Sequence, residues 1–138
     1  MGKLTHYVFA AFMLIVSSSW AREPINPQIT RVAEQWVQLL DDEQYEKAWQ
    51  ATASAYKEIE GRDHFDRMTR GVRMPLGMAV ARKLWSEWSF KSMKGRPDGQ
   101  YYYVRFNTDF KNKHSETFET VWLEWEEGLW RVTGYSLR

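Results

Sequence analysis

The hydrophobic pattern changes its period at the segment Met74-Pro75-Leu76-Gly77, and this change constrains the fold more than any other feature. Before the segment, apolar residues recur every three or four positions, as they do on amphipathic helices. After it, apolar and polar residues alternate, as they do on half-buried strands. Because helices and strands are segregated along the chain, the sequence predicts an α+β fold: three N-terminal helices packed on one face of a curved, four-stranded antiparallel sheet.

Three helices are predicted in the first half of the chain. The first begins at Pro27 with Asn26 as its N-cap, because proline loses no hydrogen bond at the first helical position. The second covers residues 45–56, where apolar side chains keep helical spacing. The third follows Gly61, with Asp63 as its N-cap, and ends before Pro75. Its predicted inner side consists of three apolar residues: Phe65, Met68 and Val72.

Four strands are predicted in the second half, at about residues 83–93, 100–111, 116–126 and 129–137. The short polar connections between them suit consecutive antiparallel hairpins. Alternation assigns seven residues of the second and third strands to the face that meets the helices: Tyr102, Val104, Phe106, Phe110, Val121, Leu123 and Trp125.

The opposite face of the two middle strands is also rich in aromatic residues. Its predicted members are Tyr101, Tyr103, Arg105, Phe118 and Trp122. If this face is not covered by helices, these side chains form an exposed aromatic cluster, which is typical of an interaction surface. A strand covered on both sides, or a β-bulge that reverses the faces, is the alternative.

The first 21 residues have the features of a secretory signal peptide. Lys3 precedes an apolar run of nine residues at positions 8–16, and small residues occupy positions 19 and 21. The run is far shorter than the roughly 20 residues that span a bilayer, so no stable membrane anchor is expected after cleavage. We predict cleavage after Ala21, a single mature domain at residues 22–138, and a periplasmic or secreted location. The alternative, a buried N-terminal helix, fits poorly because the segment has no polar face.

The composition excludes several classes of function. The chain contains no cysteine, which excludes disulfides, a thiolate nucleophile and cysteine-ligated metal. Its formal net charge is +1, and removal of Lys3 with the signal peptide leaves 18 basic and 18 acidic residues. A balanced charge on an exported chain argues against nucleic acid as a partner.

Four ordered segments carry a resemblance to a known family: "YEKAWQATASAYK", "VRMPLG", "PDGQYYYVRFNTDFKNK" and "ETVWLEWEEGLWRVTGY". Together they resemble the bacterial domain-of-unknown-function 4019 family over about Val32 to Tyr135. The resemblance implies a cone-shaped fold similar to the nuclear transport factor 2-like superfamily, in which helices close one end of a strongly curved sheet around a pocket. It implies no reaction and no catalytic residues.

Candidates for acid–base chemistry are few. Asp63, His64 and Asp66 lie at the start of the third predicted helix, where capping of the helix is the alternative role for both carboxylates. His114 lies in a polar turn and is expected at the surface. The sequence has no metal-ligand spacing, no nucleophile elbow and no glycine-rich phosphate loop, so no metal or cofactor is expected.

Five residues are candidates for the wall of a pocket: Tyr45, Trp49, Arg73, Trp88 and Phe90. The four aromatic residues could bind an apolar molecule at the mouth of a cone, or they could belong to the core. Arg73 could bind the last carbonyls of the third helix or an anionic ligand.

Two hypotheses about function follow from these patterns. The first is an exported, non-catalytic domain that forms a homodimer through the outer sheet face or binds a small apolar ligand. The second is a small enzyme of isomerase or hydrolase type with Asp63, Asp66 or His64 as general base. A carboxylate or histidine deep in an apolar cleft would favour the enzyme.

Overall fold

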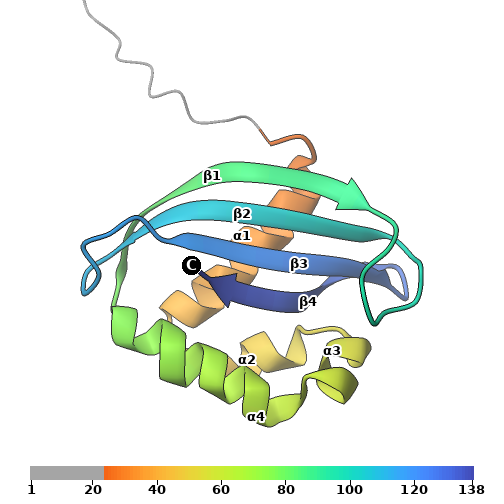
Figure 1. The fold of residues 1–138 in the computed structure, drawn as a ribbon, viewed down its shortest axis with the longest axis horizontal. Helices are drawn as coiled ribbons and strands as arrows, with labels where there is room; N and C mark the ends of the chain where they lie inside the picture. The colour runs from red at the N-terminus through yellow and green to blue at the C-terminus, as the bar shows by residue number, and fades with distance from the viewer. Residues whose placement is uncertain (1–23) are drawn as a thin grey trace, which may run out of the picture.

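The structure, a computed structural model, describes residues 24–138 (Figure 1). The predicted signal peptide therefore lies outside the described residues. The elements, in chain order, are α1 (Pro27–Asp41), α2 (Tyr45–Gln50), α3 (Ser54–Ile59), α4 (Gly61–Asp66), the π-helical segment η1 (Arg67–Arg73), the 3₁₀ turn η2 (Met74–Leu76), β1 (Ala79–Phe90), β2 (Tyr101–Phe110), β3 (Phe118–Glu126) and β4 (Leu129–Leu137). The predicted order, helices followed by strands, is confirmed. Within residues 24–138 no helix combines the length and the apolar character that a membrane span needs.

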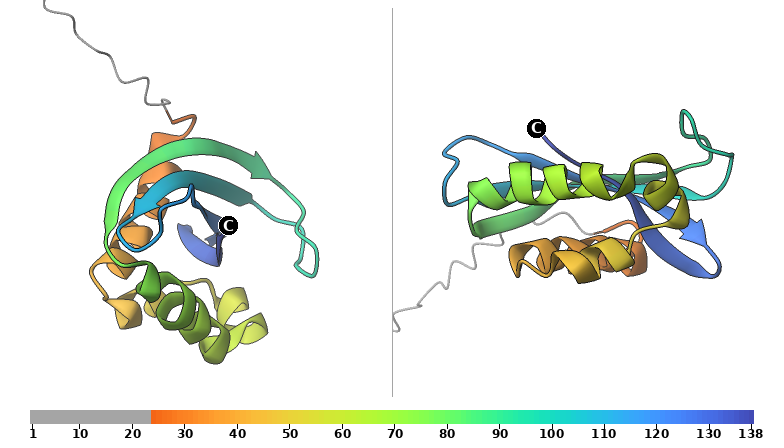
Figure 2. Two further views of the ribbon diagram at one scale, coloured as in Figure 1. Left: turned by 60° about the vertical axis from the view of Figure 1, so that its left-hand side comes forward. Right: turned by 90° about the horizontal axis from the view of Figure 1, so that it is seen from below.

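The four strands form one open sheet in the order β1-β2-β3-β4, and every neighbouring pair is antiparallel. The predicted antiparallel meander is therefore confirmed, although β1 begins at Ala79, earlier than expected. The sheet is strongly curved, and α1 and α4 lie on its concave side (Figure 2). No helix within residues 24–138 lies on the convex side of the sheet.

Helix α1 forms as the sequence predicts. The Asn26 side chain accepts a hydrogen bond from the backbone N–H of Ile29 at 3.3 Å, and Pro27 occupies the first helical position. One stripe of the helix is buried against the sheet and α2: Ile29, Ala33, Trp36, Val37 and Leu40. The indole of Trp36 donates a hydrogen bond to the carbonyl of Ala48 at 2.9 Å, which holds α1 against α2.

The second predicted helix is divided into α2 and α3, so the described chain has four α-helices and not three. The break lies at Thr52, whose hydroxyl donates to the carbonyl of Trp49 at 2.7 Å. The next backbone N–H, at Ala53, donates to the carbonyl of Val132 in β4 at 2.8 Å. Because these groups bond to a turn and to the edge of the sheet, the helix cannot continue through them.

The third predicted helix differs from the structure in two ways: in the residue at which it begins and in which of its side chains face the core. It begins at Gly61, where φ is +76°, so Asp63 lies within the first turn and is not the N-cap. From Arg67 onward the helix is π-helical, and its wider turn buries Phe65, Thr69 and Arg73 at intervals of four residues. Val72, which a regular helix would turn inward, is 44% exposed. Its predicted place on the inner side is wrong.

The core lies between the helices and the concave face of the sheet. Residues that alternation assigned to this face are buried, among them Tyr102, Val104 and Leu123. Trp125 is the exception, with 46% of its surface exposed. It pairs with Trp130 close to the β3–β4 turn, and the two indoles contact each other at 5.5 Å. Trp125 therefore packs on its neighbour in the hairpin and not on the helices.

Candidate functional site

Four largely buried charged side chains, Asp41, Arg73, Arg82 and Glu119, form one network between the helices and the sheet. Asp41, at the end of α1, is bound by two arginines: Arg73 Nη2 lies 2.6 Å from Oδ1, and Arg82 Nη1 lies 2.6 Å from Oδ2. Arg82 Nε also donates to Glu119 Oε2 at 2.7 Å. The network contains two positive and two negative side chains, so their formal charges cancel.

Glu119 is fully buried and accepts three hydrogen bonds. Besides that from Arg82, Thr108 donates to Oε2 at 2.7 Å and Tyr135 donates to Oε1 at 2.8 Å. Burial, followed by the negative charge of Glu119, raises the pKa of Tyr135 well above its usual value. The raised pKa favours the protonated hydroxyl, which donates to Glu119.

Arg73, predicted as a pocket or capping residue, belongs to this network. Its Nη1 donates to the carbonyl of Gly77 at 2.8 Å, and its guanidinium lies over the ring of Phe110 at 4.3 Å. Both carboxylates of the network are occupied by arginine, threonine and tyrosine donors. We therefore assign the network a structural role: together with Thr108 and Tyr135 it connects α1 and η1 to all four strands of the sheet.

Asp41 should make the stability of the protein depend on pH. Burial alone raises the pKa of this carboxyl, but the hydrogen bonds and charges of Arg82 and then Arg73 outweigh it, so the pKa lies below the ordinary 3.8. A lowered pKa in the folded state stabilises the protein above the unfolded-state pKa, and this stabilisation is lost as the pH falls through the folded-state pKa.

We therefore expect the difference in unfolding free energy between wild type and Asp41→Asn to be largest near neutral pH and to shrink below about pH 4. Urea unfolding of both proteins between about pH 7 and pH 3 measures this difference. A difference that stays constant over the whole range would contradict the assignment.

The three predicted acid–base residues lie on the outward side of α4. Asp63 is exposed, and His64 lies 3.8 Å from Glu60. Asp66 forms ion pairs with Arg62 at 3.2 Å and Arg70 at 3.8 Å. None of these three residues lies in a buried apolar cleft, which is the arrangement that the enzyme hypothesis requires of them.

Two carboxylates of the described chain are buried, Glu87 and Glu119, and 13% of the Asp41 side chain is exposed. Sequence reasoning singled out none of these three residues. Along β3, Glu119 points to the same face of the sheet as Val121 and Leu123, which were assigned to the core. A glutamate at a position that alternation assigns to the core was the sequence feature that could have indicated a buried carboxylate. Glu87 pairs with Val104 of β2. A β-bulge between Leu84 and Ser86 shifts the register of β1, so simple alternation along β1 does not assign Glu87 to the core face.

The five predicted pocket residues do not form one site. Tyr45 is buried in the core, and Trp49 packs against Phe65 with ring centroids 5.3 Å apart. Arg73 belongs to the charged network, whereas Trp88 and Phe90 lie on the convex face of the sheet and contact the tyrosines of β2 there. The sheet itself separates the two groups.

The convex face is partly covered by the loop between β1 and β2. The Tyr101 hydroxyl donates to the carbonyl of Pro97 in this loop at 2.6 Å, and its ring stacks on Phe90. Arg96 of the same loop donates to Thr133 Oγ1 of β4 at 2.8 Å. Only 5% of the Tyr101 surface is therefore exposed.

Tyr103 is covered as well, with 5% of its surface exposed. Trp88 packs on it at a centroid distance of 4.5 Å, and the Arg105 guanidinium lies 5.3 Å from its ring centre. The assignment of Tyr101 and Tyr103 to the convex face agrees with their register opposite Glu124 and Trp122. The expectation that the two tyrosines are exposed is wrong, because neighbouring side chains and the loop cover them.

What remains open on this face is a groove of about 310 Å³, which we call the outer aromatic groove. Its lining brings together members of the predicted pocket and of the predicted interface: Trp88, Phe90, Tyr103, Arg105 and Trp122. Trp88 is 58% exposed. Gly134 lies beneath Trp122, where an added Cβ would come within 3.1 Å of the indole, so the glycine allows this tryptophan to lie close to β4.

Arg105 brings a positive charge into the outer aromatic groove. Its Nε donates to Thr120 Oγ1 at 3.0 Å, and its guanidinium also lies 5.9 Å from the ring centre of Phe118. No carboxylate within residues 24–138 forms an ion pair with Arg105. The groove therefore combines apolar aromatic surface with an arginine that has unused hydrogen-bond donors.

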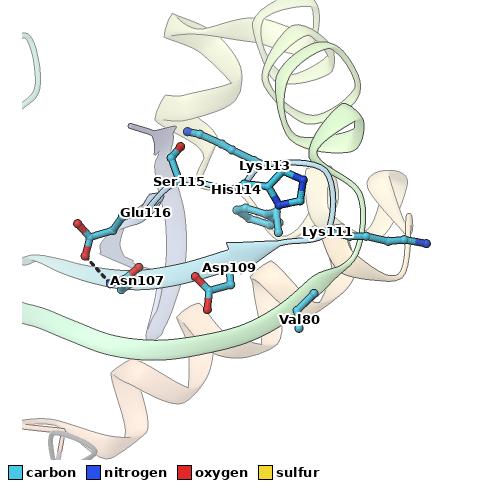
Figure 3. Close-up of a pocket in the computed structure, with 9 residues that line it drawn as sticks. Val80, Asn107, Asp109, Lys111, Lys113, His114, Ser115 and Glu116 are labelled. Carbon is cyan, nitrogen blue, oxygen red and sulfur yellow. Dashed lines mark hydrogen bonds between the residues drawn. The ribbon is translucent and has the colours of Figure 1, made fainter.

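A second hollow, of about 590 Å³, lies at the turn between β2 and β3 (Figure 3). Asn107 donates to Glu116 at 2.7 Å, and His114 is exposed, as expected from its place in a polar turn. Lys111 and Lys113 extend away from each other in Figure 3. Because its charged groups diverge, this hollow offers no convergent set of ligands.

Within the described part of the chain, no three His, Cys, Asp or Glu side chains are grouped so that they could hold a metal ion. A family model described as "Protein of unknown function (DUF4019)" matches residues 32–135. Comparison with curated proteins and with solved structures gave no match.

Proposed function

The chain belongs to the DUF4019 family, and we propose that it is an exported, non-catalytic interaction domain that forms a homodimer through its outer aromatic groove. Export rests on the signal peptide predicted in the first 21 residues. The proposal includes a cone-like fold similar to the nuclear transport factor 2-like superfamily, which the curved sheet with helices on its concave side supports.

One observation carries the proposal: tryptophan is exposed on a sheet face that no helix of the described residues covers. Trp85 and Trp88 are 52% and 58% exposed, and Trp122 is half-buried between them and β4. Aromatic side chains of this size lose much apolar surface to water when a partner covers them. Clusters of them on a surface are typical of protein–protein interfaces.

The charges on the same face favour a second copy of the chain as the partner. Lys83 and Arg105 on the convex face are basic, whereas Asp109 and Glu116, further along the same face, are acidic. In a twofold dimer each copy presents both signs to the other, so opposite charges can pair across the interface. Arg105, which has no carboxylate partner within the described chain, would gain one.

We expect Trp88→Ala to weaken the dimer at least tenfold, or by about 1.4 kcal/mol, because central tryptophans carry much of the binding energy of an interface. Sedimentation equilibrium of wild type and variant over a range of concentrations measures the dissociation constants. Far-ultraviolet circular dichroism checks that Trp88→Ala is folded, since it uncovers Tyr103.

The matched control is Trp125→Ala, which removes another exposed tryptophan, 46% exposed, that does not line the groove. Its dissociation constant should equal that of wild type. A wild-type protein that remains monomeric at hundreds of micromolar, or a control variant that weakens the dimer as much as Trp88→Ala, would refute the proposal.

A further inference from the structure

A hollow of about 650 Å³ lies where the start of α1 meets the end of β1 and the start of β2, and we call it the α1 hollow. Six of its lining residues present apolar or aromatic surface: Ile25, Ile29, Phe90, Tyr101, Tyr102 and Trp130. Its volume is in the range of sites that bind small molecules, about 300–1,000 Å³. The α1 hollow is separate from the charged network, which contributes no residue to its lining.

The wall of the α1 hollow contains a buried polar group that lacks a partner. Tyr102 is 4% exposed, and its hydroxyl makes no hydrogen bond of ordinary geometry to any residue of the described chain, although the backbone of Asn26 lies near it. A buried hydroxyl without a partner costs free energy unless a ligand or water bonds to it. A ligand or an accompanying water that reaches this hydroxyl from the α1 hollow would satisfy it.

Next to the hollow, Glu87 is buried, but its carboxylate is already occupied. It accepts hydrogen bonds from the backbone N–H of Ile25 and from the hydroxyl of Thr30. Thr30 lies in the first turn of α1 and Ile25 directly precedes the N-cap Asn26, so both donors lie at the N-terminal end of the helix, where its dipole also favours a negative charge. Glu87 thus fastens α1 to β1 and is not available as a binding group for a ligand.

The charge at the rim of the hollow indicates the kind of ligand. Lys91 lines the hollow, is exposed, and forms no ion pair within residues 24–138. No acidic residue is part of the lining. An apolar interior with one cation at its rim is complementary to an amphipathic molecule that has an apolar body and an anionic head.

We propose that the α1 hollow binds a small amphipathic anion, with its apolar body against Ile29, the ring of Tyr102 and Trp130 and its anionic head at Lys91. The hydroxyl of Tyr102 donates to an oxygen of the bound molecule or to a water that accompanies it. Each methylene group that enters the hollow adds burial energy, so affinity should increase with chain length until the hollow is full.

Isothermal titration calorimetry with dodecanoate, below its micelle concentration, tests the proposal on the full chain. We expect saturable binding, stronger for dodecanoate than for the uncharged dodecanol. Lys91→Gln should weaken dodecanoate binding about fivefold and remove the preference for the anion. Lys94→Gln, which changes an exposed lysine of the same loop that does not line the hollow, should bind as wild type does.

Two further variants test the place of binding. Tyr102→Phe keeps the ring and removes the hydroxyl, and it should weaken binding about fivefold. Ser89→Trp replaces an exposed lining residue by one large enough to fill the hollow, and it should abolish binding. Trp88→Ala, which affects the proposed dimer, should leave dodecanoate binding unchanged, so the two proposals can fail separately.

Absence of saturable binding to the wild type would overturn the inference. Unchanged binding in the folded Ser89→Trp variant would overturn it as well, because the ligand would then occupy another place. Equal affinity for dodecanoate and dodecanol would refute the assignment of Lys91 to the anionic head.

Discussion

Replacement of Glu119 by alanine is expected to lower the free energy of unfolding by about 3–5 kcal/mol, because it leaves two largely buried arginines with one carboxylate, Asp41, and so an uncompensated positive charge. Glu119 is fully buried and accepts from Arg82 at 2.7 Å, while Arg82 is 16% exposed at its side chain. The substitution also removes the acceptor of Thr108 and Tyr135. Each of these buried donors then loses its hydrogen bond, which adds to the loss.

Urea unfolding measures the change in stability, and Glu46→Ala is the control. Glu46 also pairs with an arginine, Arg62 at 2.8 Å, but this pair is at the surface, with 61% of the Glu46 side chain and 38% of the Arg62 side chain exposed. Its substitution should leave the unfolding midpoint close to that of wild type. If both variants lose the same stability, the buried network does not have the role that we assign to it.

A second variant distinguishes two effects of Glu119→Ala on stability: the loss of a negative charge from the network and the cavity that the missing side chain leaves. Introduction of Arg82→Met into Glu119→Ala removes the excess positive charge and leaves Asp41 paired with Arg73, so it should recover part of the lost stability. In a wild-type background the same Arg82→Met should destabilise the protein, because Asp41 and Glu119 then lose a donor. Opposite signs in the two backgrounds are the expected result.

Phe65→Ala is expected to destabilise the protein by about 3–5 kcal/mol, the range for removal of a buried phenylalanine. Phe65 has no exposed surface and packs against Trp49 at 5.3 Å. Val72→Ala, seven positions later, should change the stability by less than about 1 kcal/mol. On a regular α-helix these two side chains would lie on nearly the same face, but the π-helical segment turns Val72 into solvent.

The two unfolding free energies, measured under the same conditions, test the phase of η1. A loss for Val72→Ala comparable to that for Phe65→Ala would mean that the segment forms a regular α-helix with Val72 inward. Thr69→Ala provides a further comparison, because Thr69 is buried and its hydroxyl donates to the carbonyl of Phe65 at 2.8 Å.

The charged network also explains why the site proposed for a ligand lies at the start of α1. The family resemblance implies a pocket between the helices and the sheet. In the described chain, the ion pairs of Asp41, Arg73, Arg82 and Glu119 occupy part of that space. The α1 hollow, at the end of β1, is where apolar walls and an unpartnered hydroxyl occur together.

Sequence patterns alone determined the features that depend on near neighbours along the chain. The cap of α1 follows from Asn26 and Pro27, which act on the backbone within one helical turn. The α+β class and the antiparallel order of the strands follow from the change of period and from short polar turns. The faces of β2 follow from alternation, which any extended chain must obey.

Contacts between residues far apart in sequence decided the rest. The break at Thr52 depends on the bond from Ala53 to Val132, and the burial of Tyr101 depends on a loop that Arg96 anchors to Thr133. The charged network joins Asp41 to Arg82 across 41 positions. These bonds satisfy buried polar groups that local propensity leaves open, so only the tertiary structure specifies where the helices break, which aromatic residues face water and which carboxylates are buried.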